Sequence, residues 1–524
     1  MRRIHSSIAT PNSNPSAPAW PGARWRSPRW ARLRAGLLGL LLLIPVWLPG
    51  QTTRYWDRNG ALAGAGGAAP AGTWSGGGSH ANWNADPAGG GSGTVSWVAD
   101  DDAVFSAGTD ATGSFLVTVG TTLAATQSVN SVTVEEGTVT FGGLAKIALT
   151  GKTGNNGTAK FEVKAGASAI SSVTGAGYLT GTNGLNKLGG GVLWMGSTEY
   201  YKGNTYIDAG LCYMTTHSGT TDKTPFGTNS SGPTMIYIQN GAGIVASTNA
   251  AGTAVILPSF YTVSLGATGG GMLGAVSGLD YQVEARITGA GSLVINGAPG
   301  LTGTVAVRGA ADYAGGTTVS NGTLLVSSAL GSGAVTVEGG TLAGNGTIGG
   351  AVTVNAGGTL SPGASIGALT ITNDLTLRGN TLIEVDRDAG TNDFVGGVKL
   401  LTAGGTVTVS NLGSPVEAGD TFRVFSANTY SGSFTVSGAG VSWVLTNGVL
   451  AVVGGGRPTL HVAQTNSVLT FSWAGSFKLQ AQTNETGIKL GDANWFDYSN
   501  GSTSPVNVTI APANPSVFFR LSSP

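Results

Sequence analysis

The sequence predicts an all-β fold: a parallel β-helix followed by a small C-terminal antiparallel β-domain. The first observation is a repeat, in which Gly-Thr-Leu recurs at equal spacing, starting at Gly322, Gly340 and Gly358. The second is the alternation of apolar and polar residues beside each copy, as in Ala334–Val337. The third is composition, because 88 Gly and 10% charged residues disfavour helices. Short repeated strands with glycine turns indicate coils that stack and share one core.

Residues 1–50 are predicted to be a signal peptide with a long basic n-region. They hold seven Arg and no acidic residue, and an apolar run over 35–48 follows the last Arg. That run has the length of a signal-peptide core and is short for a membrane span. We expect cleavage after Gly50 and membrane contact only through this segment. The alternative is an uncleaved anchor.

The rest of the chain is weakly acidic. It carries 19 basic and 26 acidic residues, a net charge of −7. Such a chain lacks the basic surface of a nucleic-acid-binding protein, so no nucleic acid partner is expected. The single cysteine, Cys212, excludes an intramolecular disulfide and is predicted to be a small buried residue.

Residues 51–150 are expected to form a Trp-rich N-terminal cap and the first β-coils. Large aromatic side chains bury much area, so four of them in a Gly-rich stretch can close the open end of a solenoid. The alternative is a carbohydrate-stacking surface. The four residues are Trp56, Trp74, Trp83 and Trp97.

Residues 151–453 are expected to continue the β-helix, less regularly up to residue 300. The polar stretch Thr215–Pro233 is predicted to be a long loop leaving the wall, the usual place for function on a solenoid. Residues 454–458 have the composition of a linker. Residues 459–524 are predicted to form a C-terminal β-domain that caps the open edge or acts as an export or attachment signal.

Two long motifs connect the chain to a known family. The run Tyr313–Leu324 and the run Leu360–Ile371 resemble autotransporter-associated β-strand repeats, and a decayed copy spans 187–211. The passenger regions of that family are right-handed parallel β-helices, so the resemblance implies this fold for an exported, passenger-like chain. Because the stretch after Arg457 is too short for a translocator barrel, we expect none.

Shorter matches lie near both ends. Tyr55–Asp57 and Ala103–Gly108 resemble the start of a large group of exported repeat proteins, and Pro515–Leu521 resembles their short terminal β-domain. The set Glu384–Asp386 with Asn392–Phe394 resembles the end of autotransporter passengers, which implies no catalysis there.

Three glycine motifs resemble active-site loops and are predicted to be structural turns. Gly344–Gly349 matches the dinucleotide fingerprint, and Gly363–Gly367, with Ser365, matches the nucleophile elbow, but neither precedes a helix. Gly151–Thr153 ends like a phosphate-binding loop, yet Lys146 stands where the first Gly is required.

Metal and cofactor sites are not expected. The histidines are His5, His80, His217 and His461, and no two lie at ligand spacing. The run Asp100–Asp102 lacks the alternating carboxylates of a calcium loop and is predicted to be solvated.

The densest acidic set leaves an enzymatic alternative open. Glu384 and Asp386 are predicted to point to the same side of a strand, which is compatible with a carboxylate pair. With Asp388 and Asp393 they are the candidates for a polysaccharide lyase or hydrolase on a β-helix. The prediction adopted is a non-enzymatic structural or adhesive repeat protein, at the cell surface or secreted, with the periplasm as an alternative. Expected partners are extracellular polysaccharide or cell-surface components; a glycan-binding module is the third alternative.

Overall fold

The computed structural model describes residues 51–76, 80–91, 93–122, 126–171, 176–196, 198–214, 224–229, 233–247, 254–454, 459–473, 477–484, 487–489, 491–510 and 516–522. The predicted signal peptide and most of the predicted loop 215–233 lie outside these residues. Within them the regular secondary structure is almost entirely β-strand, and the exceptions are the short 3-10 helices η1 (Asn155–Gly157) and η2 (Asp492–Asn494). The predicted all-β class is confirmed.

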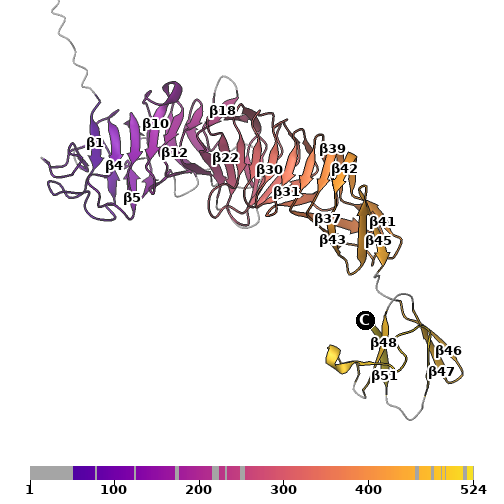
Figure 1. Ribbon diagram of the computed structural model, residues 1–524. Helices are drawn as coiled ribbons and strands as arrows, with labels where there is room; N and C mark the ends of the chain where they lie inside the picture. Colours follow the sequence, from indigo (N-terminus) through magenta and orange to yellow (C-terminus); the bar gives the residue numbers. More distant parts are fainter. Residues whose placement is uncertain are drawn as a thin grey trace, which may run out of the picture. The chain divides into compact units, whose positions relative to one another are not determined.

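Most strands before residue 440 form three parallel ladders, the three faces of a parallel β-helix (Figure 1). Face 1 runs through β1 (Thr53–Trp56), β4 (Asp102–Phe105), β7 (Ser131–Val134), β10 (Ala159–Val163), β13 (Leu185–Leu188), β16 (Thr205–Ile207), β18 (Thr234–Ile238), β21 (Tyr261–Leu265) and β24 (Arg286–Gly289). It continues through a bridge at Ala311 to β29 (Ala329–Leu330), β32 (Thr347–Ile348), β35 (Ala368–Ile371) and the start of β39 (Phe394–Ala403).

Face 2 is a second ladder of strands that follow those of face 1 along the chain. Its members are β2 (Gly72–Trp74), β5 (Ser114–Val119), β8 (Thr138–Gly143), β11 (Ser168–Ile170), β14 (Val192–Met195), β17 (Leu211–Met214), β19 (Gly243–Ala246), β22 (Gly271–Ala275), β25 (Leu293–Ile295), β27 (Thr317–Val319), β30 (Val335–Val337), β33 (Val352–Val354), β36 (Leu375–Leu377), the end of β39 and β42 (Phe425–Gly432).

Face 3 consists of two parallel sheets. The first holds β6 (Thr126–Val129), β9 (Lys146–Leu149), β12 (Ala176–Gly181) and β15 (Thr198–Tyr201). The second holds β20 (Val255–Leu257), β23 (Asp280–Val283), β26 (Thr304–Val307), β28 (Thr323–Val326), β31 (Thr341–Gly344), β34 (Thr359–Pro362), β37 (Asn380–Asp386), β40 (Thr406–Asn411) and β43 (Thr435–Gly438), with β38 (Thr391–Asn392) antiparallel to β37.

The sequence repeat has the length of one coil. Thr323 pairs with Thr341, and Thr341 pairs with Thr359, in β28, β31 and β34. The less regular region keeps its coils too, because Phe161 pairs with Lys187, and Lys187 with Ile207, in unbroken parallel register. Variable loops between the strands, and not lost coils, make its sequence period irregular.

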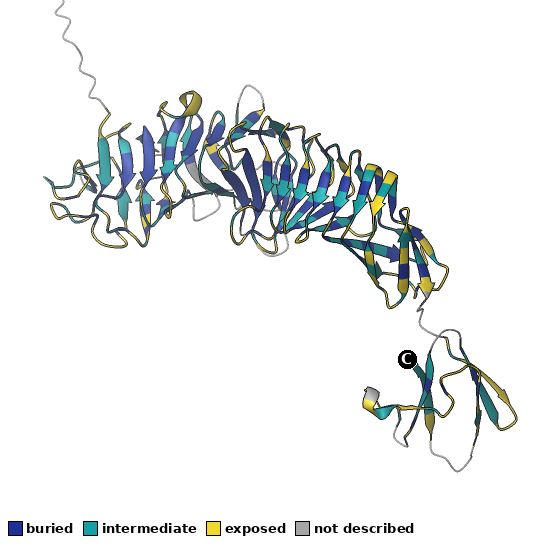
Figure 2. Ribbon diagram, in the orientation of Figure 1, coloured by how far each residue is buried: buried dark blue, intermediate teal, exposed yellow. Residues whose placement is uncertain are grey.

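Alternate residues of each strand face inward and share one core. The burial pattern of β37, for example, alternates strictly between partly exposed and buried residues, and Figure 2 shows this banding along the wall. Inward residues stack on their equivalents in the next coil, which is how a solenoid buries apolar area that no single coil can bury.

Antiparallel strands close both ends of the β-helix. At the N-terminal end β3 (Trp83–Asn84) pairs antiparallel with β1 and covers the edge of face 1. At the other end β41 (Thr421–Arg423), β44 (Ser442–Thr446) and β45 (Val449–Gly454) form a small antiparallel sheet. Its Phe422, Trp443 and Leu450 belong to the core of the solenoid. Covering these edges blocks strand pairing with other chains.

The predicted C-terminal antiparallel β-domain is confirmed. One sheet contains β46 (His461–Thr465), β47 (Val468–Ser472) and β50 (Val506–Thr509), and the other contains β49 (Phe496–Asp497), β48 (Lys478–Thr483) and β51 (Val517–Ser522). Its core of Phe471, Trp473, Leu479 and Val506 is separate from that of the solenoid. The core of the solenoid instead includes residues of the β41–β45–β44 sheet, so that sheet covers the last coil. The sequence analysis did not predict this cap.

One predicted loop is partly wrong. Within Thr215–Pro233, residues 224–229 are part of the wall, because Thr228 bridges Lys202 in parallel and Phe226 is fully buried. The Phe226 amide donates a hydrogen bond to the Tyr261 hydroxyl, and that hydroxyl donates to the carbonyl of Gly227. Because the segment is mostly polar, its composition did not indicate that Phe226, near its centre, is buried in the core.

Candidate functional site

The four N-terminal tryptophans lie inside the protein. Trp56, Trp74 and Trp83 have no exposed surface and Trp97 has 5%. Their rings pack on one another, with centroids 4.7 Å apart for Trp83 and Trp97 and 5.3 Å for Trp56 and Trp83. The Trp56 indole donates to the carbonyl of Pro70. Since their faces are buried, these indoles do not provide a surface on which sugars stack.

The acidic set is spread over a strand and the turn after it. Glu384 and Asp386 do point to the same, outward side of β37, as predicted, on either side of buried Val385. Asp386 accepts a hydrogen bond from the amide of Ala389, and exposed Asp388 accepts one from the amide of Ser414, which lowers its pKa. These two aspartates therefore bind backbone amides of the chain itself.

Asp393 is the buried member of the set. It is fully buried, and its two carboxylate oxygens accept the amides of Gly367, at 2.9 Å, and Glu384, at 2.8 Å. Burial raises its pKa to about 6, against the effect of these two hydrogen bonds. The side chain ties β37 to the turn before β35, a structural role.

The other candidate ligands have separate partners. Asp101 is buried and ion-paired with Arg54, so the prediction of a solvated run is wrong at this residue. Asp102 accepts from Asn130 and Ser131, and Asp100 accepts from Thr150. His80 is hydrogen-bonded to Ser75, His461 is exposed, and His5 and His217 lie outside the described residues. Among the residues that the structure describes, no three His, Cys, Asp or Glu side chains gather as a metal-binding group.

The glycine motifs lie in turns between strands. Gly344–Gly349 starts at the last residue of β31, passes through residues 345–346 and contains β32, while Gly363–Gly367 joins β34 to β35, with Ser365 exposed. Gly151–Thr153 follows β9, on which Lys146 lies. The helix N-terminus that a phosphate or a nucleophile elbow requires does not occur at these described positions.

Cys212 is buried, as predicted. Burial raises the pKa of its thiol to about 12, so it stays protonated and unreactive. Lys187 of β13 is also buried, and its ammonium donates to the carbonyls of Leu188, Gly189 and Ala209. Burial lowers its pKa to about 8.

A pair of aromatic residues faces outward from face 2. Trp194 of β14 and Tyr213 of β17 are paired in register and are both partly exposed, with ring centroids 4.6 Å apart. Sequence analysis missed this pair. Its signal was the alternation in Val192–Met195 and Leu211–Met214, where each aromatic residue stands between two inward residues.

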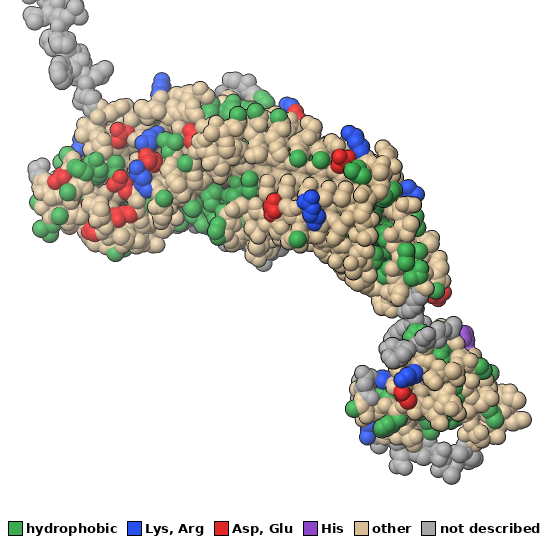
Figure 3. Space-filling model, in the orientation of Figure 1, with side chains coloured by type: hydrophobic (Ala, Val, Ile, Leu, Met, Phe, Trp, Pro, Cys, Tyr) green, Lys and Arg blue, Asp and Glu red, His purple; other side chains and the backbone are tan. Residues whose placement is uncertain are grey.

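An apolar cluster adjoins the aromatic pair on the same wall. Val245, Met272 and Leu301 are buried outside the main core, with Tyr213 and Leu211 packed against them. Leu301 lies over Gly274, where an added Cβ would come within 2.5 Å of its Cδ1. Figure 3 shows hydrophobic side chains gathered on the wall around β22.

A row of threonines continues this outward surface. Met272 pairs with Val294, and Val294 pairs with Thr318. From there each coil contributes one directly paired, partly exposed threonine, namely Thr318, Thr336, Thr353, Thr376 and Thr402. Neighbouring strands lie about 4.8 Å apart, so the hydroxyls repeat at that interval.

Face 2 is also uncharged over most of its length. Its strands from β2 to β36, all of whose residues the structure describes, contain no Asp, Glu, Lys or Arg. Face 1 differs, since it carries Arg54, Lys160, Glu162 and Arg286 within its strands. The face 2 strands from β2 to β36 are therefore neutral and change from aromatic to hydroxyl-bearing along the solenoid, while exposed Glu338 directly follows β30 and exposed Asp374 and Arg378 flank β36.

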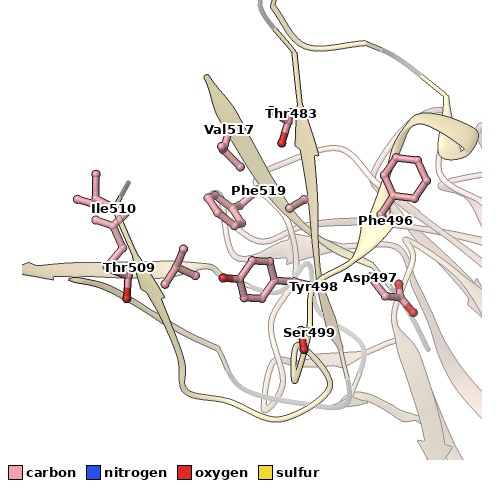
Figure 4. A pocket seen from close by; sticks show the side chains of 12 residues that line it. Thr483, Phe496, Asp497, Tyr498, Ser499, Thr509, Ile510, Val517 and Phe519 are labelled. Atoms are coloured by element: carbon pink, nitrogen blue, oxygen red, sulfur yellow. The ribbon is translucent and has the colours of Figure 1, made fainter. Parts of the chain in front are cut away.

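The C-terminal domain holds a pocket of about 680 Å³ between its two sheets. Figure 4 shows Tyr498 and Phe519 directed into it, with Phe496 at one side. Phe496 is 70% exposed, and Asp497 is engaged by Lys478 and Gln480. The pocket is lined by polar and apolar side chains in similar measure, and its one carboxylate is already paired.

One curated protein is similar to a large part of the chain. No family model matches the sequence. The chain is 31% identical over 309 residues to the "Adhesin BmaC autotransporter" of Brucella suis biovar 1 (strain 1330), a match that covers 58% of this chain and 7% of that protein. The chain thus spans a small part of the length of its distant autotransporter homologue.

Proposed function

We propose that the protein is an exported structural or adhesive protein of the cell surface. The observation that carries the proposal is the similarity of 309 residues to an autotransporter adhesin, in a chain whose coils form a continuous wall. A solenoid presents the same face on successive coils, so weak contacts with a repetitive partner add up.

The proposal includes the absence of a catalytic step. Its support is that Asp386, Asp388 and Asp393 are engaged by backbone amides of neighbouring strands and turns. These hydrogen bonds, and the burial of Asp393, favour a structural role for the three aspartates and leave Glu384 as the residue to test. Release of reducing ends from a broad polysaccharide panel should be undetectable for the wild type and for Glu384→Gln. Turnover that Glu384→Gln abolishes would establish the enzymatic alternative.

Export is the second part of the proposal. It rests on the basic and apolar pattern of residues 1–50. No helix in the described part of the chain is long and apolar enough to cross a membrane. Cell fractionation with N-terminal sequencing of the native protein tests export. A surface or extracellular chain that starts at Gln51 is expected, and a full-length cytosolic chain contradicts the proposal.

Adhesion is tested on whole cells. Cells that produce the protein should attach to surfaces or to one another more than cells in which its gene is deleted, and complementation should restore attachment. If both kinds of cell attached equally although the protein was exposed at the surface, the adhesive role would be contradicted and the structural role would stand.

A further inference from the structure

We propose that the outer wall of face 2 binds an uncharged polysaccharide lying along the solenoid. The inference rests on the proposed adhesive function and names the partner class and the surface. It starts from charge: a polyanion needs basic side chains, and a polycation needs acidic ones, yet the face 2 strands from β2 to β36 that the structure describes carry neither. The charged residues directly beside these strands, Glu338 and Arg378, have opposite signs and share Asn355 as a hydrogen-bond partner. Neither sign of charge therefore dominates, and a neutral polymer is the partner that fits this surface.

The aromatic pair provides the anchor. The rings of Trp194 and Tyr213 stack on each other, with centroids 4.6 Å apart and planes tilted by 32°, and both side chains remain partly exposed. One face of a pyranose ring carries C–H groups, which pack on aromatic rings, while its hydroxyls stay in water. Tyr and Trp suit such amphipathic contacts because each combines a large apolar face with a polar group. Desolvation of the Tyr213 phenol, whose pKa burial already raises, favours its neutral form.

The threonine row extends the contact. Each of Thr318, Thr336, Thr353, Thr376 and Thr402 carries a hydroxyl that both donates and accepts hydrogen bonds, with a methyl group beside it. A sugar polymer offers hydroxyls and C–H groups in the same mixture. One threonine per coil makes many weak contacts, so a long chain should bind more tightly than a short oligosaccharide.

Face 1 offers a matched control. Tyr206 and Tyr237 are also paired in register and stacked, with centroids 4.5 Å apart, but they lie on the charged face. Tyr206 receives a hydrogen bond from Asn156, and the network around Asp208 lies beside the pair. Tyr206 is buried and Tyr237 is partly exposed, so removing Tyr237 tests whether a partly exposed, stacked aromatic residue on another face binds sugars.

The experiment is a binding titration with the full chain. Dextran, a mixed-linkage β-glucan and galactomannan are the neutral probes, alginate and heparin are the anionic probes, and binding is followed by Trp fluorescence and affinity electrophoresis. We expect binding to at least one neutral polymer, little dependence on salt, and a loss of about tenfold or more in affinity for Trp194→Ala and for Thr336→Val/Thr353→Val. Tyr237→Ala on face 1 and Phe496→Ala in the C-terminal pocket should bind like the wild type.

Several results would overturn the inference. These are preference for an anionic polymer, loss of binding in Tyr237→Ala or Phe496→Ala but not in Trp194→Ala, or no binding to any of the neutral probes. Sedimentation that shows self-association lost in Trp194→Ala would instead assign face 2 to a second copy of the chain. The adhesive function and the sugar-binding surface can fail independently. If cells that produce Trp194→Ala adhere as well as the wild type, the adhesive function stands and the role of face 2 in it is contradicted. If the chain is cytosolic but binds dextran, the sugar-binding surface stands and the adhesive function is contradicted.

Discussion

Trp194 and Tyr213 occupy directly paired positions on neighbouring coils, and their rings lie 4.6 Å apart on the outside of the wall. The inward residues beside them, Leu193 and Cys212, are also paired and fully buried. The same strand register therefore aligns the inward residues into a core that holds the coils together and the outward residues into a row that is available for contacts. The buried core beneath the pair fixes the two strands that carry it.

Asp393 should be needed for stability and should make that stability depend on pH. In Asp393→Asn the amide group supplies one acceptor for the two backbone N–H groups, so the free energy of unfolding should fall by about 1–3 kcal/mol. The folded pKa of about 6 lies above the unfolded value of ~3.9, so the native state binds more protons between these values. The contribution of Asp393 should be fully present below about pH 4 and lost as pH rises through about 6.

Urea unfolding of wild type and Asp393→Asn from pH 4 to pH 7 measures this effect. The exposed control Asp374→Asn should change the free energy of unfolding by less than about 0.5 kcal/mol at each pH. If the difference in the free energy of unfolding between wild type and Asp393→Asn increased with pH, the pKa of Asp393 would be lower in the folded state than in the unfolded state, contrary to this prediction.

Lys187 should stabilise the turn between two coils. Lys187→Met keeps most of the side-chain volume but removes the three partly buried hydrogen bonds from the ammonium to backbone carbonyls, so we expect a loss of about 2–4 kcal/mol. Lys399 is exposed, and Lys399→Met should change stability by less than about 0.5 kcal/mol. Thermal and urea unfolding followed by circular dichroism compares the two, and equal effects would mean that the buried ammonium contributes nothing specific.

Phe226 should behave as a core residue although it lies in a polar stretch. Phe226→Ala removes a fully buried ring and should cost about 3–5 kcal/mol. The nearby Phe260 is 36% exposed, and Phe260→Ala should cost clearly less. Unfolding midpoints of the two variants are the measurement. If Phe226→Ala left the unfolding midpoint unchanged, this segment would behave as the exposed loop that the composition predicts.

Gly344 should be required for the turn and not for a ligand. Its φ is +120°, and an added Cβ would come within 2.1 Å of the Val326 carbonyl oxygen. Gly344→Ala should therefore destabilise the protein by roughly 2 kcal/mol or more, whereas Gly404→Ala, which meets only one atom at 3.5 Å, should be mild. Dinucleotide binding by the wild type, measured by calorimetry, would contradict the structural role of this motif.

The sequence predicted the fold well where the coil length is constant. Thr323, Thr341 and Thr359 recur at equal spacing, so their pairing follows from the period alone. Between residues 151 and 300 the loops differ in length, and the register that joins Trp194 to Tyr213 cannot be read from spacing. The same-side placement of Glu384 and Asp386 followed from strand alternation, but the burial of Asp393 depends on how a turn folds back against β35.

The burial of the four N-terminal tryptophans could not be predicted from the sequence for a similar reason. Aromatic residues in a glycine-rich stretch are compatible with both a cap and a sugar platform, because composition does not say which side of the strand faces the core. The antiparallel pairing of β3 with β1 turns Trp83 inward, against Trp56 and Trp97. That pairing is a long-range contact without a sequence motif.

Hydroxyl-radical footprinting of the full chain, free and bound to the neutral polymer that binds best, tests the sugar-binding role of face 2 most directly. We predict that Trp194 and Tyr213 on face 2 become protected, while Tyr237 on face 1 and Phe496 in the C-terminal domain keep their reactivity. Protection confined to Tyr237 or Phe496, with Trp194 unchanged, would contradict this role.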